Sequence, residues 1–131
     1  MEILLDTHVF LWYMAGDSRL SSSAKLYVDN RENIRYLSMA SLWEIAIKYS
    51  YGRLTLMEPY ETLIPRLLQA NGINVLNMSV DHMSEVANLP FPSSTHRDPF
   101  DRLIIAQSRI EDIPVLSIDA KFDVYGIQRL W

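Results

Sequence analysis

Short apolar runs alternate with longer amphipathic segments along the chain, and this alternation restricts the fold more than any other feature of the sequence. Each apolar run is four or five residues long, rich in Val, Ile and Leu, and reads as a strand. The predicted strands are Glu2 to Leu5, Ile34 to Ser38, Ile73 to Leu76, Val115 to Ile118 and Ile127 to Leu130. Strands that alternate with helices favour an α/β fold with a mainly parallel sheet of four to five short strands.

The segments between the strands carry helix-start and helix-stop signals, such as the serine cluster at 21–23 and the cap residue Gly52. Pro65 lies inside one predicted helix, where we expect a kink or a split. No repeat, low-complexity tract or linker interrupts the chain, so we expect residues 1–131 to form a single domain. The predicted helices are Thr7 to Ala15, Ala24 to Asn30, Met39 to Tyr51, Pro59 to Asn71, Ser79 to Asn88 and Pro99 to Glu111, with a helical turn at Ala120 to Phe122.

Composition excludes several classes of protein. Hydrophobic residues make up 49% of the chain and charged residues 21%, which is typical of a globular protein. No apolar stretch approaches the length of a membrane span, and the first residues lack the pattern of a signal peptide, so we expect a cytoplasmic protein without membrane contact. The chain contains no cysteine, which excludes disulfides and thiolate zinc sites.

Acidic residues stand at or near the junctions between predicted strands and helices. Asp6 and Asp119 follow strands, whereas Glu44 and Asp101 lie within helices that adjoin strands. Because the carboxyl ends of parallel strands share one edge of a sheet, these side chains could lie close together. Carboxylates gathered at one place repel each other unless a cation neutralises them. The pattern therefore predicts a divalent-metal site.

Helix capping is the alternative explanation for these acids. Glu44 and Ser41 match a capping box, and Glu44 could instead share an exposed stripe with Lys48 or be buried with a partner. Capping does not explain why nearly every junction has an acid, since Ser or Thr would cap as well. The other acids with a cap or first-turn explanation are Asp6, Asp98, Asp101 and Asp119.

Charge does not exclude a nucleic-acid substrate, although the net charge is -4. If Asp98 and the four acids above bind metal, eleven acids remain against twelve bases, and nine of these bases are arginines. The three histidines lack metal-ligand spacing, and we expect all of them to be polar surface residues, although His8 and His96 lie near candidate acids. We expect Trp12, Trp43 and Trp131 to be core residues rather than base-stacking platforms.

Several motifs occur together in an order that resembles the PIN-domain family, in particular the VapC-type toxins of bacterial toxin–antitoxin pairs. The resemblance covers essentially the whole chain, and its last part is the ending Tyr125-Gly126-Ile127 through Leu130-Trp131. The motifs are Leu4-Leu5-Asp6-Thr7-His8, Ser41-Leu42-Trp43-Glu44-Ile45-Ala46-Ile47-Lys48, Gly52-Arg53-Leu54, His96-Arg97-Asp98-Pro99-Phe100-Asp101-Arg102 with Ile105-Ala106-Gln107, and Ser117-Ile118-Asp119.

The resemblance implies a metal-dependent endoribonuclease on a three-layer α/β/α sandwich with a central, mainly parallel sheet. Oxygen ligands favour Mg²⁺, with Mn²⁺ as a substitute. The implied partners are an RNA substrate, a small antitoxin protein and a second copy of the chain in a homodimer. The implied catalytic acids are Asp6, Glu44, Asp101 and Asp119; the metal ligands are Asp6, Asp101 and Asp119, with Asp98 as an additional acid; the supporting hydroxyls are Thr7 and Ser117; and the contacts to substrate phosphate are Arg97 and Arg102.

Two alternatives keep an α/β fold without this activity. The first is a catalytically inactive PIN-like module that binds protein or RNA, against which stands the presence of all four family acids. The second is an aspartate-based phosphatase or phosphoacceptor. That phosphatase signature requires a second Asp two residues after the nucleophile, where this chain has His8.

Overall fold

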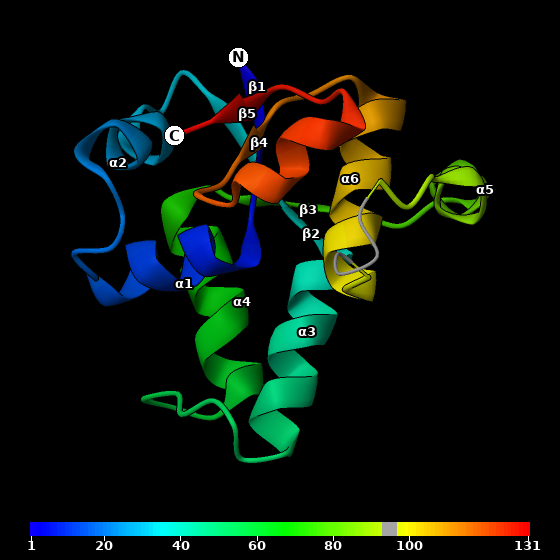
Figure 1. The fold of residues 1–131 in the computed structure, drawn as a ribbon. Coiled ribbons are helices and arrows are strands. Elements are labelled where there is room, and N and C mark those ends of the chain that lie inside the picture. The colour runs from blue at the N-terminus through cyan, green and yellow to red at the C-terminus, as the bar shows by residue number, and fades with distance from the viewer. Residues whose placement is uncertain (93–96) are drawn as a thin grey trace.

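A parallel sheet of five strands forms the centre of the computed structural model, which describes residues 1–92 and 97–131 (Figure 1). The strand order is β3-β2-β1-β4-β5, and every neighbouring pair is parallel. This arrangement confirms the predicted α/β class and the five short strands. Their bounds are β1 Glu2–Leu5, β2 Ile34–Ser38, β3 Asn74–Leu76, β4 Val115–Leu116 and β5 Arg129–Leu130.

Helices cover both faces of the sheet and give the three layers. Leu5 of β1 belongs to an apolar cluster with residues of α1, α2, α3 and α4, whereas the adjacent Leu4 belongs to a second cluster with residues of α6 and η1. Successive side chains of a strand point to opposite faces, and helices cover both faces here. Both leucines are therefore fully buried. The helices are α1 Thr7–Ala15, α2 Ser22–Asp29, α3 Met39–Ser50, α4 Tyr60–Asn71, α5 Val80–Asn88, α6 Pro99–Glu111 and the 3₁₀ helix η1 Ala120–Tyr125.

Local differences from the sequence prediction concern the ends of elements. The strand predicted to reach Ile118 ends at Leu116, and Ile118 is 49% exposed. The last strand begins at Arg129 rather than Ile127. Pro65 does not split α4, which is assigned as one helix over its full length. Pro65 has no N–H, so α4 lacks one backbone hydrogen bond at this position.

The carboxyl ends of the strands are surrounded by helix starts. Helices α1 and α3 follow β1 and β2 with almost no loop. Ser38 caps α3 by accepting a hydrogen bond from the Ala40 N–H at 3.0 Å. Helices α3 and α4 then extend beyond the edge at which β1 and β2 end (Figure 1). This edge is therefore where the acids at the junctions come to lie.

Among the described helices, none has both the length and the apolar character that a membrane span requires.

Truncation of either central leucine should destabilise the protein strongly, because both faces of β1 are buried. We expect Leu4→Ala and Leu5→Ala each to lower the free energy of unfolding by about 2–5 kcal/mol, measured by urea denaturation. Leu26→Ala on α2 is the matched control: Leu26 is 69% exposed, so its truncation should change stability by less than about 0.5 kcal/mol. A Leu4→Ala protein as stable as Leu26→Ala would contradict a core on the second face.

Candidate metal centre

Asp6 lies at the junction of β1 and α1 and is only 4% exposed. It occupies the N-cap position of α1, yet its side chain makes no capping hydrogen bond. Instead, its Oδ2 accepts a hydrogen bond from the Ser117 hydroxyl at 2.8 Å. Capping therefore does not account for a buried carboxylate at this position.

Ser117 joins the acid after β1 to the acid after β4. Its hydroxyl donates to Asp6 and accepts from the Asp119 N–H at 3.0 Å. Asp119 in turn caps η1, since its Oδ1 accepts from the Lys121 N–H at 2.9 Å. The hydroxyl is fully buried and thus fixes the relative positions of the two acidic junctions.

Glu44 lies in α3 and is buried, with its Oε2 2.7 Å from the Lys48 Nζ. The capping-box interpretation of Ser41 and Glu44 is wrong, because Ser38 is the N-cap of α3. Ser41 is fully buried rather than on an exposed stripe, and its Oγ accepts a hydrogen bond from the Thr7 hydroxyl at 2.8 Å. This bond attaches the first turn of α1 to the helix that carries Glu44.

Asp98 and Asp101 open α6 in different ways. Asp98 is the N-cap, and its Oδ1 accepts from the N–H groups of Phe100 at 2.9 Å and Asp101 at 3.0 Å. Asp101 lies in the first turn and is half-buried. Capping thus explains Asp98, whereas Asp101 lies further into the first turn of α6, where the helix dipole favours an acid.

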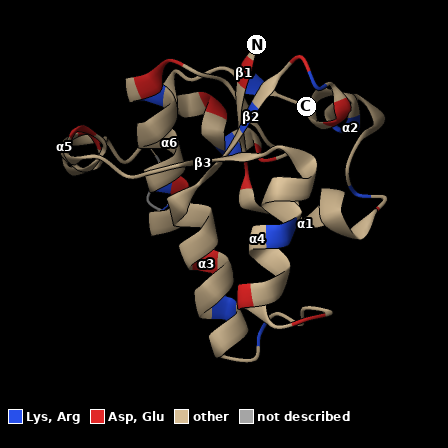
Figure 2. Cartoon of the chain, turned by 180° about the vertical axis from the view of Figure 1, so that it is seen from behind, with Lys and Arg blue, Asp and Glu red and all other residues tan. Residues whose placement is uncertain are grey.

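The acids interact electrostatically, which shows that the fold brings them together. Burial, followed by the negative charges of Asp98, Asp6, Glu44 and Asp119, raises the pKa of Asp101 to about 8. Burial also raises the pKa of Asp6, a rise that the hydrogen bond from Ser117 and the charge of His8 oppose. Figure 2 shows acidic positions on α3, at one end of α6 and between the sheet and α1.

The donor set fits a hard divalent cation. All five acids offer carboxylate oxygen, the ligand type that Mg²⁺ and Mn²⁺ prefer, and a cation would relieve their mutual repulsion. Within residues 1–92 and 97–131, no three His, Asp or Glu side chains are already arranged around one ion position. Mg²⁺ does not require such an arrangement, because it commonly binds through one or two carboxylates and keeps several waters.

The two arginines predicted to contact phosphate lie near the start of α6. Arg102 is 5% exposed and donates to the carbonyls of Leu89 at 2.7 Å and Pro90 at 3.0 Å. Its guanidinium also stacks on Phe91, 3.8 Å from the ring centre, and that of Arg97 lies 5.3 Å from the same ring. Arg102 therefore holds the segment before α6, an arrangement that does not favour a phosphate contact.

Four further sequence predictions concern histidine and tryptophan. His82 was predicted at the surface but is 1% exposed: its Nδ1 accepts from the Ser79 N–H at 3.0 Å, and its Nε2 lies 2.9 Å from Glu111. Trp43 was predicted in the core but is 55% exposed and packs edge-on against Phe100. His8 is exposed as predicted, whereas His96 lies outside the described residues.

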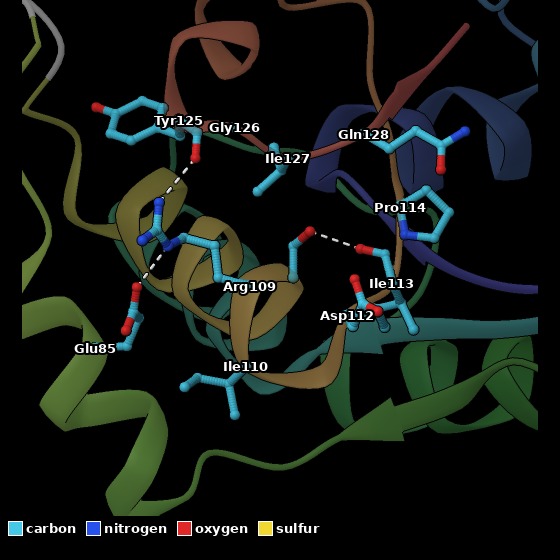
Figure 3. Close-up of a pocket in the computed structure, with 11 residues that line it drawn as sticks. Glu85, Arg109, Ile110, Asp112, Ile113, Pro114, Tyr125, Gly126, Ile127 and Gln128 are labelled. Atoms are coloured by element: carbon cyan, nitrogen blue, oxygen red, sulfur yellow. Dashed lines mark hydrogen bonds and ion pairs between the residues drawn. The ribbon is translucent and has the colours of Figure 1, made fainter.

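A cavity of about 420 Å³ lies at the opposite end of α6 from the acids (Figure 3). Its central cation, Arg109, is held by Glu85 and by the carbonyl of Tyr125 at 2.8 Å. Ser108 in its wall donates to the Ile113 carbonyl at 2.6 Å. These polar groups satisfy one another, and none of the candidate acids contributes to the lining. The set of five acids, rather than this cavity, is the candidate site.

Comparison with known proteins identifies the family of the chain. The family model described as PIN domain matches residues 3–127. Ribonuclease VapC22 of Mycobacterium tuberculosis is 28% identical over 104 residues, which cover 79% of this chain and 76% of the relative.

Solved structures share the fold at lower identity. A chain from the structure of VapBC2 from Rickettsia felis bound to a promoter DNA fragment is 15% identical, with a TM-score of 0.71 over 99% of this chain and 98% of that chain. VapC20 of Mycobacterium tuberculosis, described as a sarcin–ricin loop cleaving toxin, is 18% identical, with a TM-score of 0.61 over 95% of each chain. With the family model matching nearly its whole length, the chain belongs to the PIN-domain family.

Proposed function

We propose that this protein is a metal-dependent endoribonuclease that hydrolyses RNA phosphodiester bonds, acting as the toxin of a toxin–antitoxin pair. The observation that carries the proposal is the half-buried Asp101, which lies within electrostatic range of four other carboxylates. Membership of the PIN-domain family and similarity to a relative named as a ribonuclease support the same activity.

The acids divide into groups with different roles. Asp6, Asp101 and Asp119 would hold the metal, directly or through water, and Glu44 would either bind it or orient the attacking water. Ser117 and Thr7 position this set, because their hydroxyls join Asp6 to Asp119 and α1 to α3. Mg²⁺ or Mn²⁺, when bound, supplies a lowered pKa for water and charge stabilisation at the phosphate.

The substrate and partners follow from the same comparison. RNA in a single-stranded or loop region suits such a site, because its backbone is accessible. Arg97 remains our candidate for a phosphate contact, since its guanidinium lies beside the exposed Phe91 close to Asp98. Toxin–antitoxin complexes among the similar structures support a small antitoxin partner. A homodimer and a cytoplasmic location stay predictions.

Loss of the Asp6 charge should abolish cleavage. We expect Asp6→Asn to lower Mn²⁺-dependent cleavage of a structured RNA by at least about 100-fold, because even residues that support metal ligands commonly contribute 10- to 100-fold. Asp17→Asn is the matched control, since Asp17 lies beyond the opposite end of α1 from Asp6 and pairs with Arg19. Unchanged cleavage by Asp6→Asn would contradict its role, and no cleavage by the wild type would favour an inactive binding module.

Two substitutions at Asp98 separate capping from metal binding. If Asp98 only caps α6, Asp98→Asn should keep both stability and cleavage, because Asn caps a helix as well as Asp. Asp98→Ala should then cost about 1 kcal/mol of unfolding free energy. If Asp98 also binds metal, Asp98→Asn should lose cleavage while its thermal melting temperature stays that of the wild type.

The stability of the metal-free protein should fall as pH rises from about 4 to 8. The pKa of Asp101 is about 8 in the folded protein against a reference value of 3.8, so the folded state binds more protons in this interval. The contribution is fully present below pH 3.8 and is lost as pH rises through 8. Urea denaturation in chelator should therefore show a steeper decline for the wild type than for Asp101→Asn, and parallel profiles would contradict the shifted pKa.

A further inference from the structure

Lys48 contacts one of the five candidate acids. Its Nζ lies 2.7 Å from the Oε2 of Glu44, one helical turn earlier on α3. The Glu44 side chain is 9% exposed, whereas that of Lys48 is 44% exposed. The ammonium thus connects an acid inside the site to the solvent side of a helix that projects beyond the sheet.

This ion pair differs from an ordinary surface pair with the same spacing. Lys25 and Asp29 on α2 are also four residues apart, but their side chains are 61% and 39% exposed. Exposed pairs of this kind stabilise a helix by only a few tenths of a kcal/mol. Lys48 instead neutralises a buried acid whose charge acts on Asp6 and Asp101.

Two other cations of the neighbourhood, Arg102 and Arg129, are engaged by backbone carbonyls or by an acid outside the site. Arg102 donates to the carbonyls of Leu89 and Pro90. Arg129 donates to Asp123 and to the carbonyl of Ser117. Lys48 is bonded to one of the candidate catalytic acids itself, so events at that acid determine whether its ammonium is free.

We propose that Lys48 exchanges partners during the reaction. It pairs with Glu44 while the site lacks metal. When Glu44 binds the metal or orients the attacking water, Lys48 instead contacts an RNA phosphate beside the cleaved bond. The exchange needs only rotation of a flexible four-carbon stem, and an ammonium binds phosphate as a point charge. This inference rests on the proposed function and adds to it a substrate contact that replaces the one predicted for Arg102.

The exchange predicts opposite effects on metal and on RNA. Lys48→Met keeps most of the apolar stem and removes the competing charge, so Mn²⁺ should bind more tightly by on the order of fivefold, measured by calorimetry without RNA. At saturating Mn²⁺ the KM for RNA should rise about tenfold with little change in kcat, because a charge-assisted contact to substrate is lost.

Salt dependence and two further variants make the test specific. The slope of log KM against log salt concentration should fall by about 0.7 in Lys48→Met, the contribution of one phosphate contact on a single strand. Lys48→Arg keeps the charge and should restore most of the RNA affinity. Lys25→Met removes the matched pair on α2 and should behave as the wild type in every measurement.

A structural ion pair alone would not weaken RNA binding while strengthening metal binding. If Lys48→Met has the KM of Lys25→Met, or does not bind Mn²⁺ more tightly than the wild type, the exchange is wrong. A wild-type protein that neither binds Mn²⁺ nor cleaves RNA would instead overturn the proposed function, and the exchange with it.

Discussion

Repulsion among five carboxylates at one edge of a parallel sheet is the constraint that the surrounding structure has to accommodate. The chain meets it with a different group at each acid. Ser117 donates to Asp6, and Lys48 pairs with Glu44. Backbone N–H groups at helix starts bind Asp98 and Asp119, whose carboxylates are stabilised by these donors and by the helix dipole. At Asp101, burial and the charges of the four other acids raise the pKa to about 8.

The fold could be predicted from the sequence because its signals are local. Apolar runs such as Glu2–Leu5 and helix stops such as Gly72 depend on neighbouring residues, so the order of elements and the parallel sheet follow from the pattern. Strand ends were less accurate, since pairing partners rather than composition determine where β4 stops. His82 and Trp43 failed for the same reason: contacts with Glu111 and Phe100 lie far away in sequence.

The candidate acids and two hydroxyl residues beside them, Thr7 and Ser117, were named from the sequence, but the hydrogen bonds that these hydroxyls make were not. Asp6, Glu44 and Asp98 all match capping positions in the sequence, and the geometry separates them: Asp98 caps, whereas Asp6 and Glu44 do not. The Thr7–Ser41 hydrogen bond has no signal in the sequence, because the two residues lie 34 positions apart. The burial of Arg102 could not be predicted either, because the sequence around an arginine does not distinguish a solvent-exposed side chain from one that donates to a loop carbonyl.

The central position of β1 also determines when the site can form. In the sheet, Leu5 is paired with Leu116, and Asp6 is bonded to Ser117, across 111 residues of chain. Asp6 is therefore synthesised well before Ser117, and β1 can pair with β2 long before β4 is available on its other side. Until residues 115–119 are present, Asp6 lacks the Ser117 hydroxyl and Asp119 is missing, so the acids cannot assemble from the first part of the chain alone.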